Sequence, residues 1–160
     1  MAEFTHFKKD GSAVMVDVHE KPDTYRAASA TGTIQVSPEV FAAVRDHTAK
    51  KGDVLGVARL AGIMGAKKNA ELIPLCHIVP LTNCEVTFTT DENTNSITAV
   101  CTTSCVGKTG VEMEALTGVQ VTLLTIYDMC KAIDKHMVMS DIHLEEKTGG
   151  KSGDFRFEEK

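Results

Sequence analysis

The sequence contains no tryptophan and few other aromatic residues, with two tyrosines and six phenylalanines among 160 residues. Domains that read single-stranded RNA on a sheet stack bases on exposed aromatic side chains. The strand that we expect at residues 83–90 offers only Phe88 for that purpose. A net charge of −5 argues as well against a surface that binds nucleic acid as a whole. We therefore expect no nucleic-acid partner.

Long hydrophobic runs are also missing. No apolar segment approaches the ~20 residues that a membrane-spanning helix needs. The first residues show no basic segment followed by an apolar one, so no secretory signal is indicated. The chain is predicted to be cytoplasmic, without a membrane partner.

Cysteines are few, odd in number and without a Cys-x-x-Cys pair. Cys101 and Cys105 are four residues apart, but no third metal ligand stands near them. Reduced, mostly buried thiols are the expected state of all five: Cys76, Cys84, Cys101, Cys105 and Cys130. We expect neither a metal site nor a cofactor.

What is present is the composition of an ordinary globular chain, 42% hydrophobic and 24% charged. Its length fits one domain, residues 1–160, with a core that needs no metal or disulfide. Within it we expect a flexible N-terminal arm over about residues 1–14. A mobile loop rich in lysine and glycine is expected at about 146–153.

Hydrophobic periodicity and capping residues predict the elements. Alternation predicts strands at 25–36, 83–90, from 97 onward and at 137–144, and the middle two form a hairpin. Ser37 and Pro38 begin a helix that Gly52 ends, and Asp53 caps the next. A long helix is expected over 111–135, with a capping box between Thr109 and Glu112.

The order strand, helix pair, strand, strand, helix, strand is a split β-α-β arrangement. It predicts an α+β, ferredoxin-like fold in which helices pack on one face of an antiparallel sheet. Gly56, Gly62 and Gly65 lie inside the second helix, at a cost of up to ~1 kcal/mol each relative to alanine. Close packing against a neighbour, such as another subunit, would compensate.

Lysines stand beside glycines in three segments, at 50–52, 107–110 and 147–153. Glycine lets backbone amides approach a ligand, and lysine supplies a compact charge, so the segments could converge on a polyphosphate. The alternative is that they are solvated loops. The second segment is not a P-loop, because Thr102 stands where that motif needs its first glycine.

The long helix carries acids at its start and an acid–lysine pair near its end. Asp128 and Lys131 lie on one face, either as a surface salt bridge or as a half-buried pair with altered protonation that suits acid–base catalysis. Acids also favour a helix N-terminus, which explains Glu112 as a cap partner and leaves Glu114 freer to meet a ligand.

The segment Leu75–Cys76–His77 follows a turn made rigid by Pro74. His77 could be structural, or it could bind substrate or carry a proton near neutral pH. Nothing in the sequence pairs Cys76 with a base, so we expect a buried thiol there and not a nucleophile.

Together these segments resemble the cyclic pyranopterin monophosphate synthase family, the second enzyme of molybdenum cofactor biosynthesis. The resemblance rests on residues 75–77, 107–116, 126–131 and 147–153, supported by 51–54 and 58–59, and covers the chain from about residue 14. It implies a lyase that converts 7,8-dihydro-GTP, cyclised between C3′ and C8, to cyclic pyranopterin monophosphate and pyrophosphate. It also implies a ferredoxin-like hexamer, a trimer of dimers, with sites at subunit interfaces.

The resemblance assigns roles residue by residue. Asp128, Lys51 and Lys131 would be catalytic, and a lysine acting as a base would need a lowered pKa, which neighbouring cations could produce. The substrate-binding set would be Leu75, Cys76, His77, Met113, Glu114, Lys147, Glu112 and Lys67. The alternative from another class is a regulatory oligomer that binds a nucleotide through the same lysine loops without turnover and without need of Asp128.

Overall fold

The computed structural model describes residue 6, residue 8 and residues 10–158. Its elements follow the predicted order, with a short helix and a short strand added. In chain order they are β1 (Thr24–Gln35), α1 (Pro38–Arg45), α2 (Val54–Lys67), α3 (Asn69–Leu72), β2 (Leu81–Asp91), β3 (Ser96–Gly107), α4 (Glu112–Cys130), β4 (Val138–Thr148) and β5 (Phe155–Arg156).

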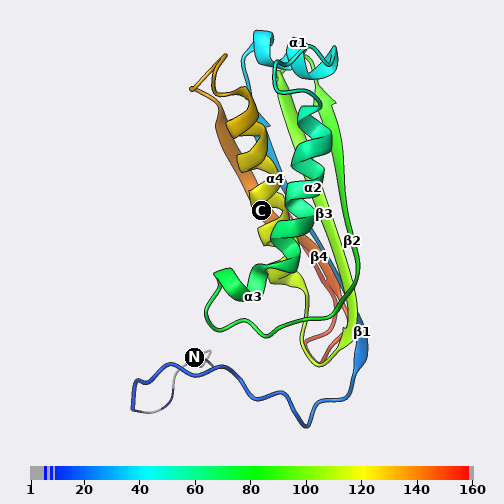
Figure 1. Ribbon diagram of the computed structural model, residues 1–160. Coiled ribbons are helices and arrows are strands. Elements are labelled where there is room, and N and C mark those ends of the chain that lie inside the picture. The colour runs from blue at the N-terminus through cyan, green and yellow to red at the C-terminus, as the bar shows by residue number, and fades with distance from the viewer. Residues whose placement is uncertain (1–5, 7, 9, 159–160) are drawn as a thin grey trace.

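The five strands form one antiparallel sheet in the order β2-β3-β1-β4-β5. Helices α2 and α4 lie side by side along one face of this sheet (Figure 1). The α+β, ferredoxin-like prediction is therefore confirmed. Among the described residues, no helix combines the length and the apolar character needed to cross a membrane.

The local signals act as expected in the first half of the chain. Alternate residues of β1, among them Ala28, Ala30 and Ile34, are buried under the helices. The side chain of Ser37 accepts a hydrogen bond from the Val40 amide at 3.3 Å, and Asp53 accepts one from Gly56 at 2.9 Å. Both predicted N-caps are confirmed.

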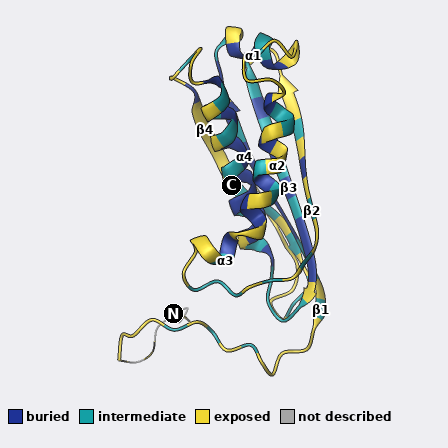
Figure 2. Ribbon diagram, in the orientation of Figure 1, coloured by how far each residue is buried: buried dark blue, intermediate teal, exposed yellow. Residues whose placement is uncertain are grey.

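Helices α2 and α4 approach each other through glycine. A Cβ on Gly62 would collide with the Thr122 hydroxyl and lie 2.9 Å from the Gly118 carbonyl oxygen, and one on Gly65 would lie 2.7 Å from Val121. The predicted close packing is thus present, but the neighbour is α4 of the same chain. Figure 2 shows the buried core between this helix pair and the sheet.

Two predicted helix boundaries are wrong. Helix α1 ends at Arg45 and not at Gly52, because His47 adopts a left-handed φ of 54° that stops the helix. Helix α4 ends at Cys130 and not at 135. After Cys130 the chain turns, and the amides of Ile133 and Asp134 both donate hydrogen bonds to the Cys130 carbonyl.

The predicted capping box is also wrong. Val111 occupies the N-cap of α4, and within the described part of the chain no side-chain capping hydrogen bond is formed there. The Thr103 hydroxyl donates instead to the Val111 carbonyl at 3.0 Å, which ties the start of α4 to β3.

Candidate active site

A pocket of about 360 Å³ lies at the end of the molecule where α4 begins. Leu75, Cys76 and His77 come to it from the segment between α3 and β2, and Met113 and Glu114 from the first turn of α4. The structure therefore brings together five of the predicted substrate-binding residues. Val79 adds to the lining from the same segment between α3 and β2. The rest of the lining comes from the N-terminal segment and the turn before α4: His6, Val16, Val18, Lys21, Thr109 and Gly110.

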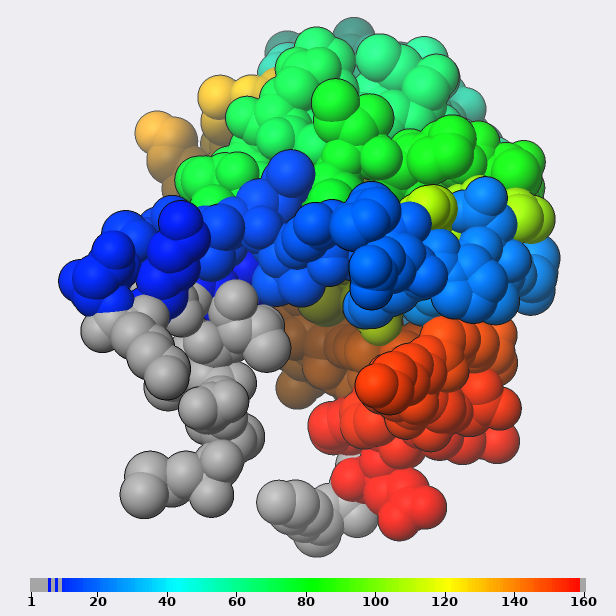
Figure 3. All heavy atoms as spheres, turned by 90° about the horizontal axis from the view of Figure 1, so that it is seen from below, coloured from blue at the N-terminus to red at the C-terminus, as the bar shows by residue number. Residues whose placement is uncertain are grey.

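The N-terminal segment is attached to this pocket through His77. The ring nitrogen Nε2 of His77 donates to the Val16 carbonyl at 2.7 Å. Seen from below, the N-terminal segment crosses this end of the molecule between the segment around residue 75 and the C-terminal hairpin (Figure 3). The predicted flexible arm lies partly outside the described residues, and its mobility stays a prediction.

Glu114 is held in a buried hydrogen-bonded chain. Its side chain is almost fully enclosed, at 4% exposure, and its Oε1 accepts from Asn69 Nδ2 at 2.9 Å. The Thr117 hydroxyl donates to Asn69 Oδ1 at 2.8 Å and fixes the orientation of that amide. Burial raises the pKa of Glu114, and the hydrogen bond from Asn69 opposes this shift.

A second pocket of about 340 Å³ adjoins the first, since Lys21, Thr109 and Gly110 line both. It is strongly cationic: Arg26, Lys108, Lys147 and Lys151 complete it, with Glu112 and Ser152. Two of the three lysine–glycine segments therefore converge, as predicted. A cluster of five cations beside amides at a helix start suits a polyphosphate.

Glycines let the C-terminal hairpin approach this cationic pocket. Gly149 and Gly150 have φ of 84° and 83°, and a Cβ on either would collide with the Tyr25 carbonyl or the Arg26 guanidinium. Across the turn, Lys147 Nζ donates to Ser152 Oγ at 2.6 Å. The loop predicted at 146–153 is the turn between β4 and the unpredicted β5. Its mobility stays a prediction.

The three predicted catalytic residues meet at the other end of α4. Lys131 Nζ donates to Asp128 Oδ1 at 2.7 Å, and Lys51 Nζ donates to Asp128 Oδ2 at 3.2 Å and to the Asp128 carbonyl at 3.0 Å. The third lysine–glycine segment, at 50–52, thus serves this cluster and not the cationic pocket.

The electrostatics of this cluster differ from the expectation. The side chains are about half exposed instead of sunk in an apolar setting. Hydrogen bonds from Lys131 and then Lys51 lower the pKa of Asp128, and the Asp128 carboxylate raises the pKa of Lys131. In the single chain Asp128 is therefore ionised, and Lys131 is not prepared to act as a base.

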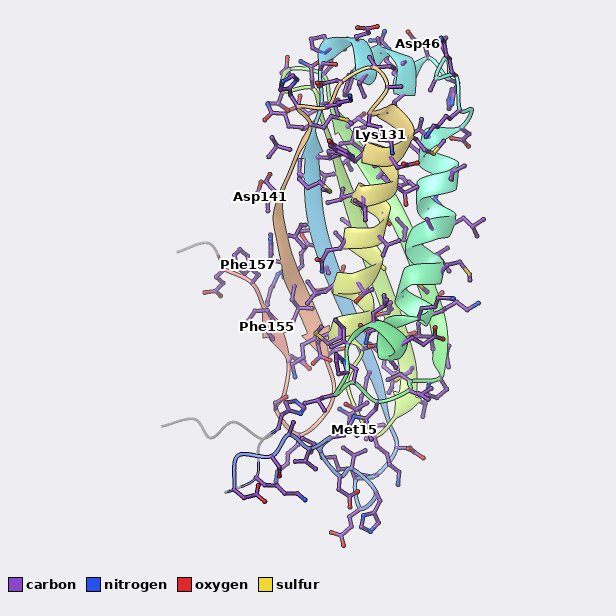
Figure 4. All side chains as sticks on the ribbon, turned by 60° about the vertical axis from the view of Figure 1, so that its left-hand side comes forward. Met15, Asp46, Lys131, Asp141, Phe155 and Phe157 are labelled. Atoms are coloured by element: carbon purple, nitrogen blue, oxygen red, sulfur yellow. The ribbon has the colours of Figure 1, made fainter. Side chains whose placement is uncertain are left out.

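The two groups of predicted residues are far apart in one chain. Fourteen residues of α4 separate Glu114 from Asp128, which at 1.5 Å per residue is about 21 Å. Figure 4 shows Lys131 near one end of the molecule and Met15, in the N-terminal segment beside the pocket, at the other. One chain by itself does not bring the three predicted catalytic residues to the predicted substrate-binding pocket.

Two predicted site residues remain to be placed, and two residues at the site were not predicted from the sequence. Of the other two predicted substrate-binding residues, Glu112 lines the cationic pocket and Lys67 lines a separate pocket beside Cys84. Sequence reasoning missed Arg26 and Asn69, since each stands alone in an unremarkable context and only the fold brings it to the site.

Known proteins resemble this chain over nearly its full length. It is 58% identical over 153 residues, 96% of each chain, to the cyclic pyranopterin monophosphate synthase of Clostridium botulinum (strain Alaska E43 / Type E3). The identity to the protein of the same name from Clostridium perfringens (strain SM101 / Type A) is 54% over 155 residues, 97% of this chain and 98% of the other. The model of the MoaC family matches residues 15–150. The chain therefore belongs to the MoaC family.

Proposed function

We infer that the protein is a cyclic pyranopterin monophosphate synthase, a lyase that acts early in molybdenum cofactor biosynthesis. The family and the names of its relatives carry this inference. The observation in the structure that supports it best is the pair of adjoining pockets, one holding a buried carboxyl group and an imidazole and the other five cations.

The proposed substrate is 7,8-dihydro-GTP cyclised between C3′ and C8, and its two halves match the two pockets. Its triphosphate suits the cationic pocket, where Arg26 can bind two phosphate oxygens through its planar guanidinium. Its fused rings suit the pocket of Met113, His77 and Glu114, because apolar contacts can hold the ring faces while the polar groups select the ring edge.

We propose Asp128, Lys51 and Lys131 as the catalytic residues. The rearrangement to a pyranopterin requires proton transfers, and closing a cyclic phosphate with loss of pyrophosphate builds up charge on phosphate oxygens. An ionised Asp128 can accept a proton, and the two ammonium groups can donate one or stabilise the leaving pyrophosphate.

We further propose that each site is shared between two copies of the chain, as in a hexamer built as a trimer of dimers. About 21 Å separates the trio from the pocket within one chain, so a second copy has to supply one of them. Helix α2 also exposes an apolar stripe, made of Val57, Leu60 and Met64, at the spacing of one helix face. Such a face suits contact between subunits.

The first experiment measures pyrophosphate release from the cyclised dihydro-GTP by the wild type and by Asp128→Asn. We expect release by the wild type and loss of at least about a hundredfold in the variant, with folding and assembly intact. Asp46→Asn is the matched control, since Asp46 is another exposed, ion-paired aspartate at the same end of the molecule. Binding without release by the wild type would favour the regulatory oligomer instead.

A second experiment tests the shared site by mixing two inactive variants. Asp128→Asn and Glu114→Gln damage opposite ends of α4, so a mixed dimer has one doubly damaged site and one intact site. After subunit exchange, equal mixing should restore about a quarter of the wild-type activity, because half of the dimers are mixed. If exchange is verified by mass spectrometry and no activity returns, the shared site is refuted.

A further inference from the structure

A third pocket, of about 320 Å³, lies where α2 ends and β2 begins. Lys67, in the last turn of α2, and Cys84, on β2, both line it, together with Val79, Leu81, Thr82 and Asn83. Cys84 is half-buried, so its thiol is neither sealed in the core nor free on the surface. The pocket adjoins the substrate pocket, because Val79 lines both.

Cys84 has a second thiol as its neighbour. Val86 pairs with Cys101 across the β2–β3 ladder, which puts Cys84 and Cys101 diagonally on the helix-covered face of the sheet. The two thiols are therefore neighbours on that face. Cys101 is fully buried against Gly118 of α4, so it is fixed in place as the partner of Cys84.

These neighbours favour the thiolate at Cys84 over the thiolate at Cys101. A hydrogen bond from Cys101 and then the charge of Lys67 lower the pKa of Cys84, whereas contact with Cys84 and burial raise that of Cys101. The thiolate is the nucleophilic form of cysteine, and a positive neighbour both stabilises it and attracts anionic reagents.

We propose that Cys84, with Lys67 beside it and Cys101 behind it, is a reactive thiol site for small, negatively charged disulfides. The Cys84 thiolate attacks one sulfur of a disulfide R–S–S–R. The Cys84 proton has already passed to solvent; a new bond forms between Cys84 and that sulfur, the old S–S bond breaks, and the second half leaves as a thiolate. The disulfide is the oxidant, and Cys84 ends as a mixed disulfide.

An internal bond between Cys84 and Cys101 is a poorer outcome of this chemistry. Diagonal neighbours on adjacent strands lie about 7–8 Å apart, beyond the usual Cα separation of a disulfide. Cys101 also stays protonated and packed against Gly118, so it supports the Cys84 thiolate without resolving the adduct.

The adduct should affect catalysis, and this part of the inference rests on the proposed function. An anionic group on Cys84 would lie beside Lys67 and next to the proposed substrate pocket, which shares Val79 with this one. Modification should therefore lower pyrophosphate release, and a thiol reductant should restore it.

The test follows thiol reaction directly and does not depend on turnover. The folded protein is mixed with the dianionic disulfide 5,5′-dithiobis(2-nitrobenzoate), the released thiolate is measured by absorbance, and the modified peptide is identified by mass spectrometry. We expect one fast thiol, at Cys84. Cys84→Ser should remove the fast phase, while Cys76→Ser, at the other half-buried cysteine, should leave it unchanged.

Two further variants test the neighbours. Lys67→Met should slow the fast phase by up to about tenfold at low salt, and should have less effect on the neutral bis(2-hydroxyethyl) disulfide. Cys101→Ala should slow both reagents more than Cys101→Ser, which keeps a hydrogen-bond donor. A fast phase that survives in Cys84→Ser, or a rate that Lys67→Met leaves unchanged, would overturn the proposal.

Failure of the proposed function gives a different pattern. If the protein does not turn over the cyclised dihydro-GTP, the fast phase at Cys84 should still be present. If turnover is present and the wild type shows no fast thiol, only the thiol site is refuted.

Discussion

The carboxyl group of Glu114 is buried and accepts a hydrogen bond from the side-chain amide of Asn69. A buried charge without that partner costs about 1–3 kcal/mol or more. The chain from Thr117 through Asn69 to Glu114 therefore has two effects, since it offsets the burial of the carboxyl group and fixes the direction in which it meets a ligand.

The first prediction at this scale concerns Asn69→Leu. The variant should lower the free energy of unfolding at neutral pH by about 1–3 kcal/mol, because an ionised Glu114 loses its donor. Denaturant titration measures this. In a Glu114→Gln background the same substitution should cost less, and an equal cost in both backgrounds would show that Asn69 acts independently of the charge.

The second prediction is a pH dependence. Because burial raises the pKa of Glu114, the folded chain holds this proton more tightly than the unfolded chain does. The stability from this group is complete below its ordinary pKa of 4.5 and is lost as pH rises through the higher folded value. Glu114→Gln should therefore gain stability over the wild type as pH rises from about 4 to about 8, measured by denaturant midpoint.

At the scale of elements, the contact between α2 and α4 depends on the absence of side chains. Gly62 faces the Thr122 hydroxyl and the Gly118 carbonyl, and it is the backbone oxygen that cannot move aside. The sequence cost of a helical glycine, up to ~1 kcal/mol, is therefore tolerated for the sake of close packing.

The third prediction is that Gly62→Ala destabilises the chain by about 1–3 kcal/mol despite the better helix propensity of alanine. Thermal and denaturant unfolding would measure it. Adding Thr122→Ala should recover only part of the loss, because the Gly118 carbonyl remains. Ala61→Gly, at a less buried neighbouring position of the same helix, is the control for propensity alone.

The sequence predicts those features of helices and strands that neighbouring residues determine, and it misses those that depend on the rest of the fold. Caps at Ser37 and Asp53 and the alternation in β1 and β2 are local, and they were read correctly. The ends of α1 and α4 depend on a left-handed His47 and on a turn after Cys130, which propensity does not show. Strand β5 has two residues, Phe155 and Arg156, and exists only because β4 offers an edge.

The candidate site divides in the same way. Lysine–glycine segments and the acid-rich start of α4 were visible because each is a local pattern with a chemical meaning. Arg26 and Asn69 were not visible, because only pairing of β1 with β3 and the turn into α3 bring them to their partners. The resemblance to a known family predicts Asp128, Lys51 and Lys131 as catalytic residues, but it does not show that they lie at the end of α4 away from the pocket.

At the scale of the whole molecule, the exposed stripe on α2 leads to the fourth prediction. Leu60 is 63% exposed in the single chain, and Leu60→Glu should weaken assembly and lower pyrophosphate release in parallel. Analytical ultracentrifugation and the activity assay measure the two effects. Gln120→Glu, an exposed polar position on α4, is the control for added charge. Full assembly of Leu60→Glu would remove this face from the interface.

With a shared site, the length of α4 makes the activity per chain depend on the concentration of the protein. If its two ends belong to different sites, a separated chain is folded but carries two half-sites, and neither half can complete a reaction. Activity per chain would then fall on dilution below the dissociation constant of the dimer, without any inhibitor or unfolding. The onset of catalysis in a growing cell would thus depend on how much of this protein has accumulated.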